Sequence, residues 1–191
     1  MGRIAPRSGQ NAGFSLPELL VVLGVVGILA GLFAPRVDVA KFRQDSAILE
    51  VSTALIVAQQ KAVLRGHRVR VGFDTAASRL IIHEDADNDR AVSSGEDVRV
   101  VELGEGVVFG LGGAQALNSV PFDFTASASG IPTLGFSRNG GASQEGTIYL
   151  TSRRAQLSSS FPQDARALKL ERSTGHVTCY SNRSGAWKAA C

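Results

Sequence analysis

The chain has 191 residues, of which 44% are hydrophobic and 19% charged, so it can bury one sizeable core but has little room for two complete domains. Its formal net charge of +3 permits contact with nucleic acid or anionic lipid and requires neither. Composition therefore argues against a multidomain protein and leaves the class of partner open.

A long apolar segment lies close to the N-terminus. From Phe14 to Ala34 the only ionisable side chain is Glu18, over a length that can cross a bilayer as a helix. A secretory signal peptide would need a cleavage site near Ala34, but Pro35 follows directly and no small-x-small pattern precedes it. The segment therefore predicts a transmembrane helix.

The start of this segment carries a specific motif, because residues 13–23 read Gly-Phe-Ser-Leu-Pro-Glu-Leu-Leu-Val-Val-Leu. This stretch resembles the processing site and anchor of type IV prepilins and type II secretion pseudopilins. The resemblance implies that a prepilin peptidase cuts after Gly13 on the cytoplasmic side and that the new N-terminal residue, Phe14, is methylated. The family's glutamate at mature position five and proline at position twenty-two fall on Glu18 and Pro35.

Glu18 stands out because a carboxylate inside a bilayer costs about 3 kcal/mol and needs a partner. The amine that cleavage would free at Phe14 can supply one. In the family, this glutamate is thought to pair with the N-terminal amine of a neighbouring subunit, which sets the register of assembly. The resemblance thus implies an assembly role for Glu18. The alternative is a polar residue tolerated near the end of the helix.

Beyond Pro35 the chain has an amphipathic helical pattern. Apolar side chains recur at steps of three and four residues, at Ile48, Val51, Leu55, Ala58 and Ala62. The pattern predicts that the helix continues to about residue 64 and ends at Gly66. Together with the anchor it would form one spine roughly 75 Å long at 1.5 Å per residue.

The rest of the chain changes to a period of two, which is typical of short antiparallel strands. Expected strands are Val69–Phe73, Leu80–His83, Val98–Leu103, Val107–Leu111, Leu134–Arg138, Gly146–Thr151, a strand around Leu168–Leu170, and Val177–Tyr180. Residues 112–133 predict a long loop with an apolar interruption at 120–124. Asn139-Gly140 predicts a hairpin between the strands on either side, and Thr174-Gly175 predicts another.

These elements predict an α+β fold in which a long N-terminal transmembrane and amphipathic helix packs on an antiparallel, β-rich globular head. With the segment Leu-Gly-Phe-Ser-Arg-Asn-Gly at 134–140, the layout resembles the FimT/FimU/GspH branch of minor pilins and pseudopilins. The implied organisation is a leader at 1–13, a transmembrane helix at 14–35, an amphipathic helix at 36–66 and a head at 67–191.

The resemblance implies a structural subunit, not an enzyme, that primes, caps or decorates a pilus-type filament in pilus biogenesis or protein secretion. The implied location is a single pass through the bacterial inner membrane, with the head in the periplasm or carried into the filament. Implied partners are the prepilin peptidase, other minor pilins or pseudopilins, the major pilin and the inner membrane. No cofactor is expected.

Two cysteines, Cys179 and Cys191, lie within the last thirteen residues and are separated by a short polar loop. This spacing suits a terminal disulfide, which would persist only in an oxidising compartment. The alternative is a pair of free thiols.

The acidic stretch after residue 84 raises the question of a metal. Asp85, Asp87, Asp89 and Glu96 occupy positions one, three, five and twelve of an EF-hand-type calcium loop. Arg90 stands where that loop requires glycine, and the flanks read as strands, so a solvated acidic turn is the favoured interpretation and no metal site is predicted. Catalysis is also not predicted, since nucleophile-elbow and phosphate-loop motifs are missing and the three histidines lack metal-ligand spacing.

DNA binding is the main alternative function, because the FimT group that the chain resembles is associated with DNA uptake in natural transformation. The C-terminal part is basic, and its candidate DNA-binding residues are Arg172, Arg183 and Lys188, with Trp187 or Tyr180 available for stacking. The Gly-Arg-x-Arg element of that group would fall on residues 175–178, where both arginines are absent. A solvated basic face is the favoured interpretation. A third possibility is a bitopic membrane-anchored β-domain unrelated to filaments.

Overall fold

The computed structural model describes residues 14–33, 39–117, 130–183 and 185–189. The chain divides into two units, Met1–Asp38 and Val39–Cys191. The first contains helix α1 (Leu16–Phe33), and the second contains helix α2 (Val39–Arg65) and all the strands.

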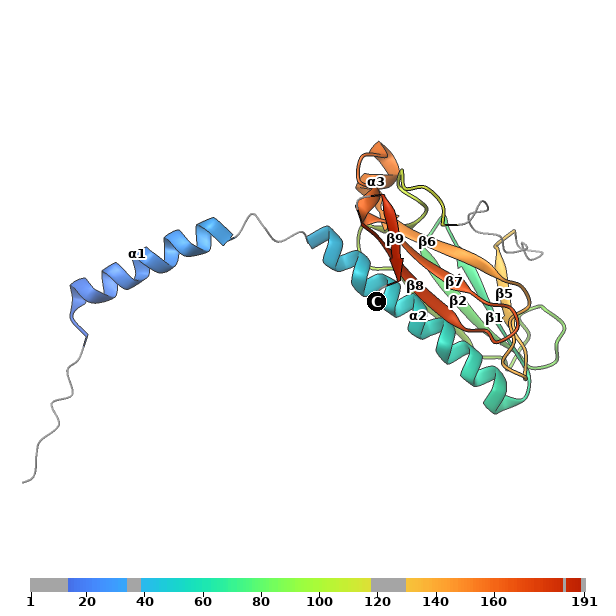
Figure 1. Ribbon diagram of the computed structural model, residues 1–191. Helices are drawn as coiled ribbons and strands as arrows, with labels where there is room; N and C mark the ends of the chain where they lie inside the picture. The colour runs from blue at the N-terminus through green and yellow to red at the C-terminus, as the bar shows by residue number, and fades with distance from the viewer. Residues whose placement is uncertain (1–13, 34–38, 118–129, 184, 190–191) are drawn as a thin grey trace, which may run out of the picture. The chain divides into compact units, whose positions relative to one another are not determined.

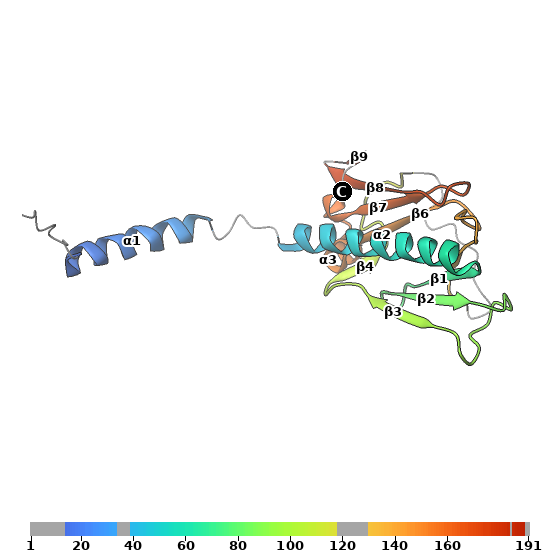
Figure 2. The same ribbon diagram turned by 90° about the horizontal axis from the view of Figure 1, so that it is seen from below.

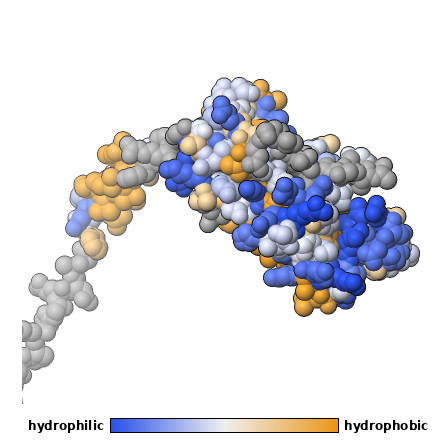
Figure 3. Space-filling model, turned by 45° about the vertical axis from the view of Figure 1, so that its right-hand side comes forward, coloured by the Kyte–Doolittle hydropathy of each residue, from blue (hydrophilic) through white to orange (hydrophobic). Residues whose placement is uncertain are grey.

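Helix α1 is apolar on every face. Its sequence consists of Leu, Val, Ile, Gly, Ala and Phe apart from Pro17 and Glu18 in the first turn. Every side chain described between residues 14 and 32 is exposed within the chain, and most of the face of the helix that Figure 3 shows is coloured hydrophobic. A helix that is apolar all round is stable only when lipid or other helices cover it.

Helix α2 is the helical element of the head. It ends where the sequence predicts, because Gly66 adopts a left-handed φ of 72° and its N–H donates to the carbonyl of Ala62 at 3.1 Å. The five apolar residues predicted on its inner face, Ile48, Val51, Leu55, Ala58 and Ala62, are all at most 1% exposed. Residues 34–38 lie outside the described residues, so the continuity of the two helices as one spine stays a prediction.

Two antiparallel sheets complete the head. The first has the strand order β3 (Val98–Glu102), β2 (Arg79–Asp85), β1 (Arg68–Asp74) and β5 (Thr133–Phe136). The second has the order β4 (Val107–Phe109), β6 (Gly146–Ser152), β7 (Arg166–Leu170), β8 (Val177–Arg183) and β9 (Ala186–Ala189). A short helix α3 (Arg153–Ser158) and a 3-10 turn η2 (Pro162–Asp164) join β6 to β7.

One hydrophobic core holds the head together. It combines the inner face of α2 with side chains from both sheets, such as Phe73, Leu134, Ile148 and Leu168, all fully buried. Helix α2 runs along the strands of the head in Figure 1, and in Figure 2 β1 to β3 lie on one side of it and β6 to β9 on the other. The predicted α+β class, with a helix on antiparallel sheets, is confirmed.

Pairing between strands was predicted less well than their positions. The hairpin expected around Asn139-Gly140 is wrong, because β5 pairs with β1 in one sheet and β6 pairs with β4 and β7 in the other. The turn itself forms, with Gly140 N–H donating to the carbonyl of Ser137, but the chain crosses between sheets after it. The β7–β8 hairpin around Thr174-Gly175 is confirmed, with Leu170 opposite Val177.

Three further differences concern single elements. The strand expected at 107–111 ends at Phe109, since Gly110 and Gly112 both have positive φ and leave the sheet. Strand β9 and helix α3 were not predicted. The apolar residues at 120–124 lie outside the described residues.

Candidate functional site

The N-terminal turn of α1 contains the residues of the predicted processing and assembly site. Gly13 lies outside the described residues, whereas Phe14 is 78% exposed and Glu18 is in the first helical turn. The Glu18 carboxylate accepts a hydrogen bond from the backbone N–H of Ser15 at 3.4 Å, and Leu19 N–H donates to the carbonyl of Ser15 at 3.1 Å. The Glu18 carboxylate is thus hydrogen-bonded to the backbone N–H of Ser15, the residue that follows Phe14.

This arrangement matches one half of a capping box, in which a glutamate at the third helical position reaches back to the N-terminal residue of the helix. Ser15-x-x-Glu18 has the required spacing, so the sequence itself contains this helix-start signal. Pro17 falls at the second helical position, where no intrahelical hydrogen bond is lost. The first turn is therefore compatible with Glu18 facing a positive group placed at Phe14.

The outer face of α2 carries a second candidate surface, an apolar stripe of Phe42, Leu49, Ile56 and Val63. These side chains recur every seven residues and are 72%, 50%, 42% and 50% exposed. A seven-residue repeat keeps side chains along one narrow line of a helix, which is the pattern used in packing against another helix. The seven-residue spacing of this stripe is present in the sequence, but it was not predicted as a surface because the apolar pattern of the inner face covers the same helix.

By length and composition, α2 is also the one helix in the described part of the chain that is long and apolar enough to cross a membrane. Its inner face lies in the core of the head, where Ile48 and Leu55 contact the sheets and are at most 1% exposed. We therefore assign α2 to the head. Helix α1, which is exposed all round, is the candidate membrane anchor.

The acidic loop between β2 and β3 is organised by Glu96. One Glu96 oxygen accepts the N–H of Ala86 at 2.7 Å, and the other accepts the N–H of Ser93 at 2.9 Å and lies 2.6 Å from His83 Nε2. The Ser93 hydrogen bond, followed by the His83 contact, lowers the pKa of Glu96 to about 2. Glu96 thus closes the loop with both of its oxygens and is not available as the twelfth-position ligand of a calcium loop.

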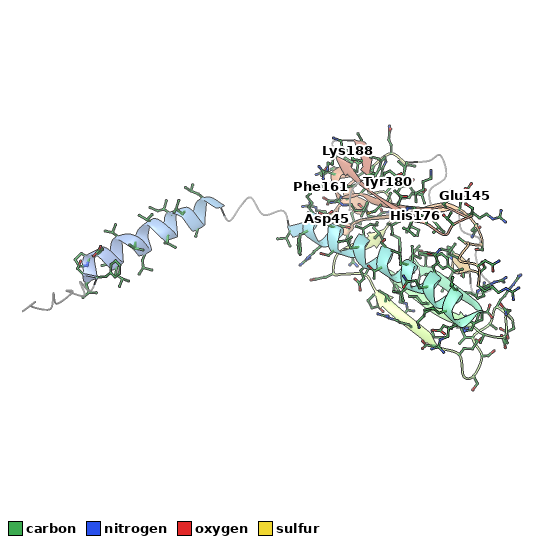
Figure 4. All side chains as sticks on the ribbon, turned by 60° about the horizontal axis from the view of Figure 1, so that its bottom comes forward. Asp45, Glu145, Phe161, His176, Tyr180 and Lys188 are labelled. Carbon is green, nitrogen blue, oxygen red and sulfur yellow. The ribbon has the colours of Figure 1, made fainter. Side chains whose placement is uncertain are left out.

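The candidate DNA-binding residues do not gather at one place. Arg172 lies in the turn after β7, whereas Arg183 is the last residue of β8, about 20 Å along that strand at 3.4 Å per residue. Lys188 lies on β9 opposite Ser181 of β8, and Arg183 lies two residues further along β8. In Figure 4, Lys188 lies on the same side of the head as Asp45.

Two other arginines of the basic C-terminal part are neutralised by acids. Arg166 is 1% exposed, and its Nε donates to Asp45 on α2 at 2.7 Å. Arg154 forms a two-point contact with the buried Asp164, at 2.8 and 3.1 Å. These ion pairs use the positive charges of the two arginines to stabilise the head. Fewer positive charges are therefore available for contacts with phosphate groups.

The aromatic candidates for base stacking are partly used as well. The Trp187 ring lies 5.9 Å from the ring of Tyr149, and its indole N–H donates to the carbonyl of Gln115 at 2.8 Å. Tyr180 is half-buried in β8. Neither Trp187 nor Tyr180 is therefore a fully exposed ring of the kind on which the bases of single-stranded nucleic acid stack.

Cys179 lies in β8 and packs against the core of the head. Cys191 lies outside the described residues, so the Cys179–Cys191 disulfide stays a prediction.

Comparison with known families gives two matches. The model of the family described as "Prokaryotic N-terminal methylation motif" matches residues 9–34, and that of "Type II transport protein GspH" matches residues 47–175. The methylation motif together with the apolar helix α1 defines a membrane-anchored protein of the pilin type. Since the second match covers about two thirds of the chain, the protein belongs to the GspH family.

Among individual relatives, the pilin-like protein PilA1 of Thermus thermophilus is 30% identical over 95 residues, which cover 49% of this chain and 61% of the relative. The chain thus spans about three fifths of that relative's length. The minor pseudopilin EpsH of the Vibrio cholerae type 2 secretion system has a TM-score of 0.47 at 15% identity, covering 75% of this chain and 98% of EpsH. The type IV minor pilin FimU of Pseudomonas aeruginosa has a TM-score of 0.48 at 16% identity, covering 77% of this chain and 93% of FimU.

Proposed function

We propose that this protein is a minor type IV pilin or type II secretion pseudopilin, a structural subunit that primes, caps or decorates a pilus-type filament. The observation that carries the proposal is the order of parts along one chain. A methylation motif at 9–34 contains an apolar helix with a single carboxylate, and a GspH-family sequence follows at 47–175. The protein would act as a substrate of processing and as a building block, not as an enzyme.

In this proposal, residues 1–13 are a leader that the prepilin peptidase removes after Gly13, and residues 14–35 hold the protein in the inner membrane. The amphipathic helix at 36–66 and the β-rich part of the head at 67–191 lie in the periplasm. The freed amine of Phe14 pairs with Glu18 of a neighbouring subunit. The position of Glu18 in the first turn supports this role, because its carboxylate already accepts a backbone hydrogen bond beside Phe14.

The exposed stripe of α2 supports contact with other subunits. Four apolar side chains in a line are poorly placed in water, and burying them against another helix gains about 25 cal/mol for each Å² covered. Sibling minor pilins and the major pilin are the partners that the proposal assigns to this face.

The test is intact mass and N-terminal analysis of the membrane-extracted protein from cells with and without their prepilin peptidase. We expect a chain that begins at methylated Phe14 only when the peptidase is present. Gly13→Val should block cleavage, because a branched side chain replaces the smallest residue at the cut bond, whereas Gly2→Val, in the same leader, should be processed normally. A full-length chain in both strains would remove the filament proposal and favour an unrelated membrane-anchored β-domain.

A further inference from the structure

A polar pocket lies at the end of the head where α2 leads into β1, and its volume is about 310 Å³. In Figure 1 this end of the head is at the lower right, where α2 ends. Three separate turns and loops supply the side chains that line the pocket. They are the turn between α2 and β1 with His67 and Arg68, the β2–β3 loop with Asn88, and the turn after β5 with Ser137, Arg138 and Asn139.

The described side chains that line this pocket can all donate hydrogen bonds, and none of them is a carboxylate. Arg68 and Arg138 are the two permanent cations, and neither forms an ion pair with another described residue. Arg70, two residues further along β1, differs in this respect because it pairs with Asp85 at 3.8 Å. The pocket thus brings together two guanidinium groups from distant parts of the chain without an acid between them.

Two positive charges in one pocket repel each other, so this arrangement is unfavourable unless a negative group lies near both. The C-terminal end of α2 is close by, because Gly66 also lines the pocket. Its partial charge of about −0.5 can offset only part of the two full charges of Arg68 and Arg138. A bound anion would neutralise the remainder.

The turn that carries Arg138 is fixed to the rest of the head. The Gln59 side-chain amide on α2 donates to the carbonyl of Gly140 at 2.7 Å. Within the turn, the Ser137 hydroxyl donates to the carbonyl of Gly141 at 3.1 Å. A site whose walls are already held in position loses less conformational entropy when a ligand binds.

We infer that this pocket binds a small phosphate-type oxyanion between Arg68 and Arg138, with Asn139 as a further donor. The planar guanidinium group matches the oxygens of a phosphate with two parallel N–H donors. Because the pocket is open to water, we expect a Kd of the order of 1 mM. The inference does not depend on the filament function.

A compact anion suits this end of the head better than an extended polyanion does. The exposed carboxylates of Asp87 and Asp89 flank Asn88 in the chain, and Asn88 lines the pocket. These two negative charges would repel the neighbouring phosphates of a DNA backbone, whereas a single phosphate group can lie between the arginines alone.

The test is thermal unfolding of the full chain in detergent micelles, first without phosphate and then with sodium phosphate at constant ionic strength. With a Kd near 1 mM, about 10 mM phosphate should raise the Tm by about 3–6 °C. The double variant Arg68→Gln, Arg138→Gln should lose this shift, because glutamine keeps a polar side chain without the charge. Arg138→Gln alone changes an exposed residue, so it should fold normally and lose most of the shift.

The matched control is Arg99→Gln, Arg153→Gln, which removes the same charge from two exposed positions on β3 and α3. This control should keep the full shift, and it corrects for the general stabilisation that phosphate gives to folded proteins. An absent shift in the unaltered protein, or a shift in both pocket variants equal to that of the control, would overturn the inference. A short DNA duplex at the same total phosphate concentration should give a smaller shift, and a larger one would overturn the assignment to a small anion.

Discussion

Asp164 lies where β6, α3 and β7 meet, and its carboxylate is completely buried. Burial is the largest single influence and raises its pKa. The hydrogen bonds from Arg154 and Ser152, with the charges of Arg154 and Arg166, outweigh burial, so the pKa is lowered from its usual value of 3.8. The Ser152 hydroxyl that donates to Asp164 also accepts the N–H of Ala155 and so caps α3.

A lowered pKa in the folded state means that Asp164 stabilises the head above its unfolded pKa of about 3.9. This contribution should be lost as pH falls below about 4 and through the lower folded pKa. Asp164→Asn should therefore cost about 2 kcal/mol near pH 7, because charge-assisted hydrogen bonds are weakened. The variant should also lose less stability between pH 6 and pH 3 than the unaltered protein does.

Thermal melts of the full chain in detergent at pH 7, 5, 4 and 3, compared with the same series for Asp164→Asn, measure this difference. Glu145→Gln serves as a control, since that carboxylate is exposed and belongs to no ion pair among the described residues. Parallel pH profiles for the unaltered protein and Asp164→Asn would contradict the role given to Asp164.

At the scale of elements, α2 has two apolar faces, one buried in the core of the head and one exposed. Leu55 is fully buried in the core of the head, while its neighbour Ile56 is 42% exposed on the outer stripe. Adjacent residues on a helix point about 100° apart, which is why one side chain can stabilise the fold while the next remains free for a partner.

We expect Ile56→Asp to leave folding nearly unchanged, within about 0.5 kcal/mol, because the side chain lies at the surface. The same variant should reduce recovery with sibling pilins from membranes by about tenfold or more, since placing a carboxylate in an apolar contact costs more than 1.4 kcal/mol. Leu55→Ala should do the opposite and destabilise the head by about 3 kcal/mol.

Gln156→Asp is the matched control for this experiment, because it adds the same charge at an exposed position of α3, away from the stripe on α2. Normal copurification of Ile56→Asp would show that this face does not contact other subunits. A loss of folding in that variant would contradict the separation of the two faces.

For the molecule as a whole, the predicted Cys179–Cys191 disulfide would close the C-terminal end onto β8. A bond across so short a loop should stabilise the folded protein by about 2–3 kcal/mol, because it restricts the unfolded chain. Alkylation followed by intact mass counts the free thiols: none is expected without reductant and two with it. Replacing both cysteines with serine should lower the Tm, and two reactive thiols in the untreated protein would show that the bond is not formed.

Periodicity predicted which residues of the head are buried, because that depends on positions close together in the chain. The inner face of α2 and the alternation of burial in β5 and in the first residues of β1 and β2 all follow from local spacing. Strand partners could not be predicted in the same way. Strand β5 pairs with β1, some sixty residues earlier, through contacts that no turn between them specifies. The sequence predicted the Asn139-Gly140 turn, but it did not predict that the chain crosses from the first sheet to the second after this turn.

The sequence alone determined the apolar anchor, the lone carboxylate within it and the α+β class, because composition and short-range spacing are sufficient for these. Only the tertiary structure decided which basic side chains are paired with acids and which lie close enough together to bind one partner. Arg166 and Asp45 lie 121 residues apart yet form a pair, and Arg172 is separated from Arg183 by the length of a strand. It also showed Glu96 bonded to His83 and the buried Asp85 paired with Arg70. Such pairings depend on which segments the fold brings together, and local sequence patterns carry no information about them.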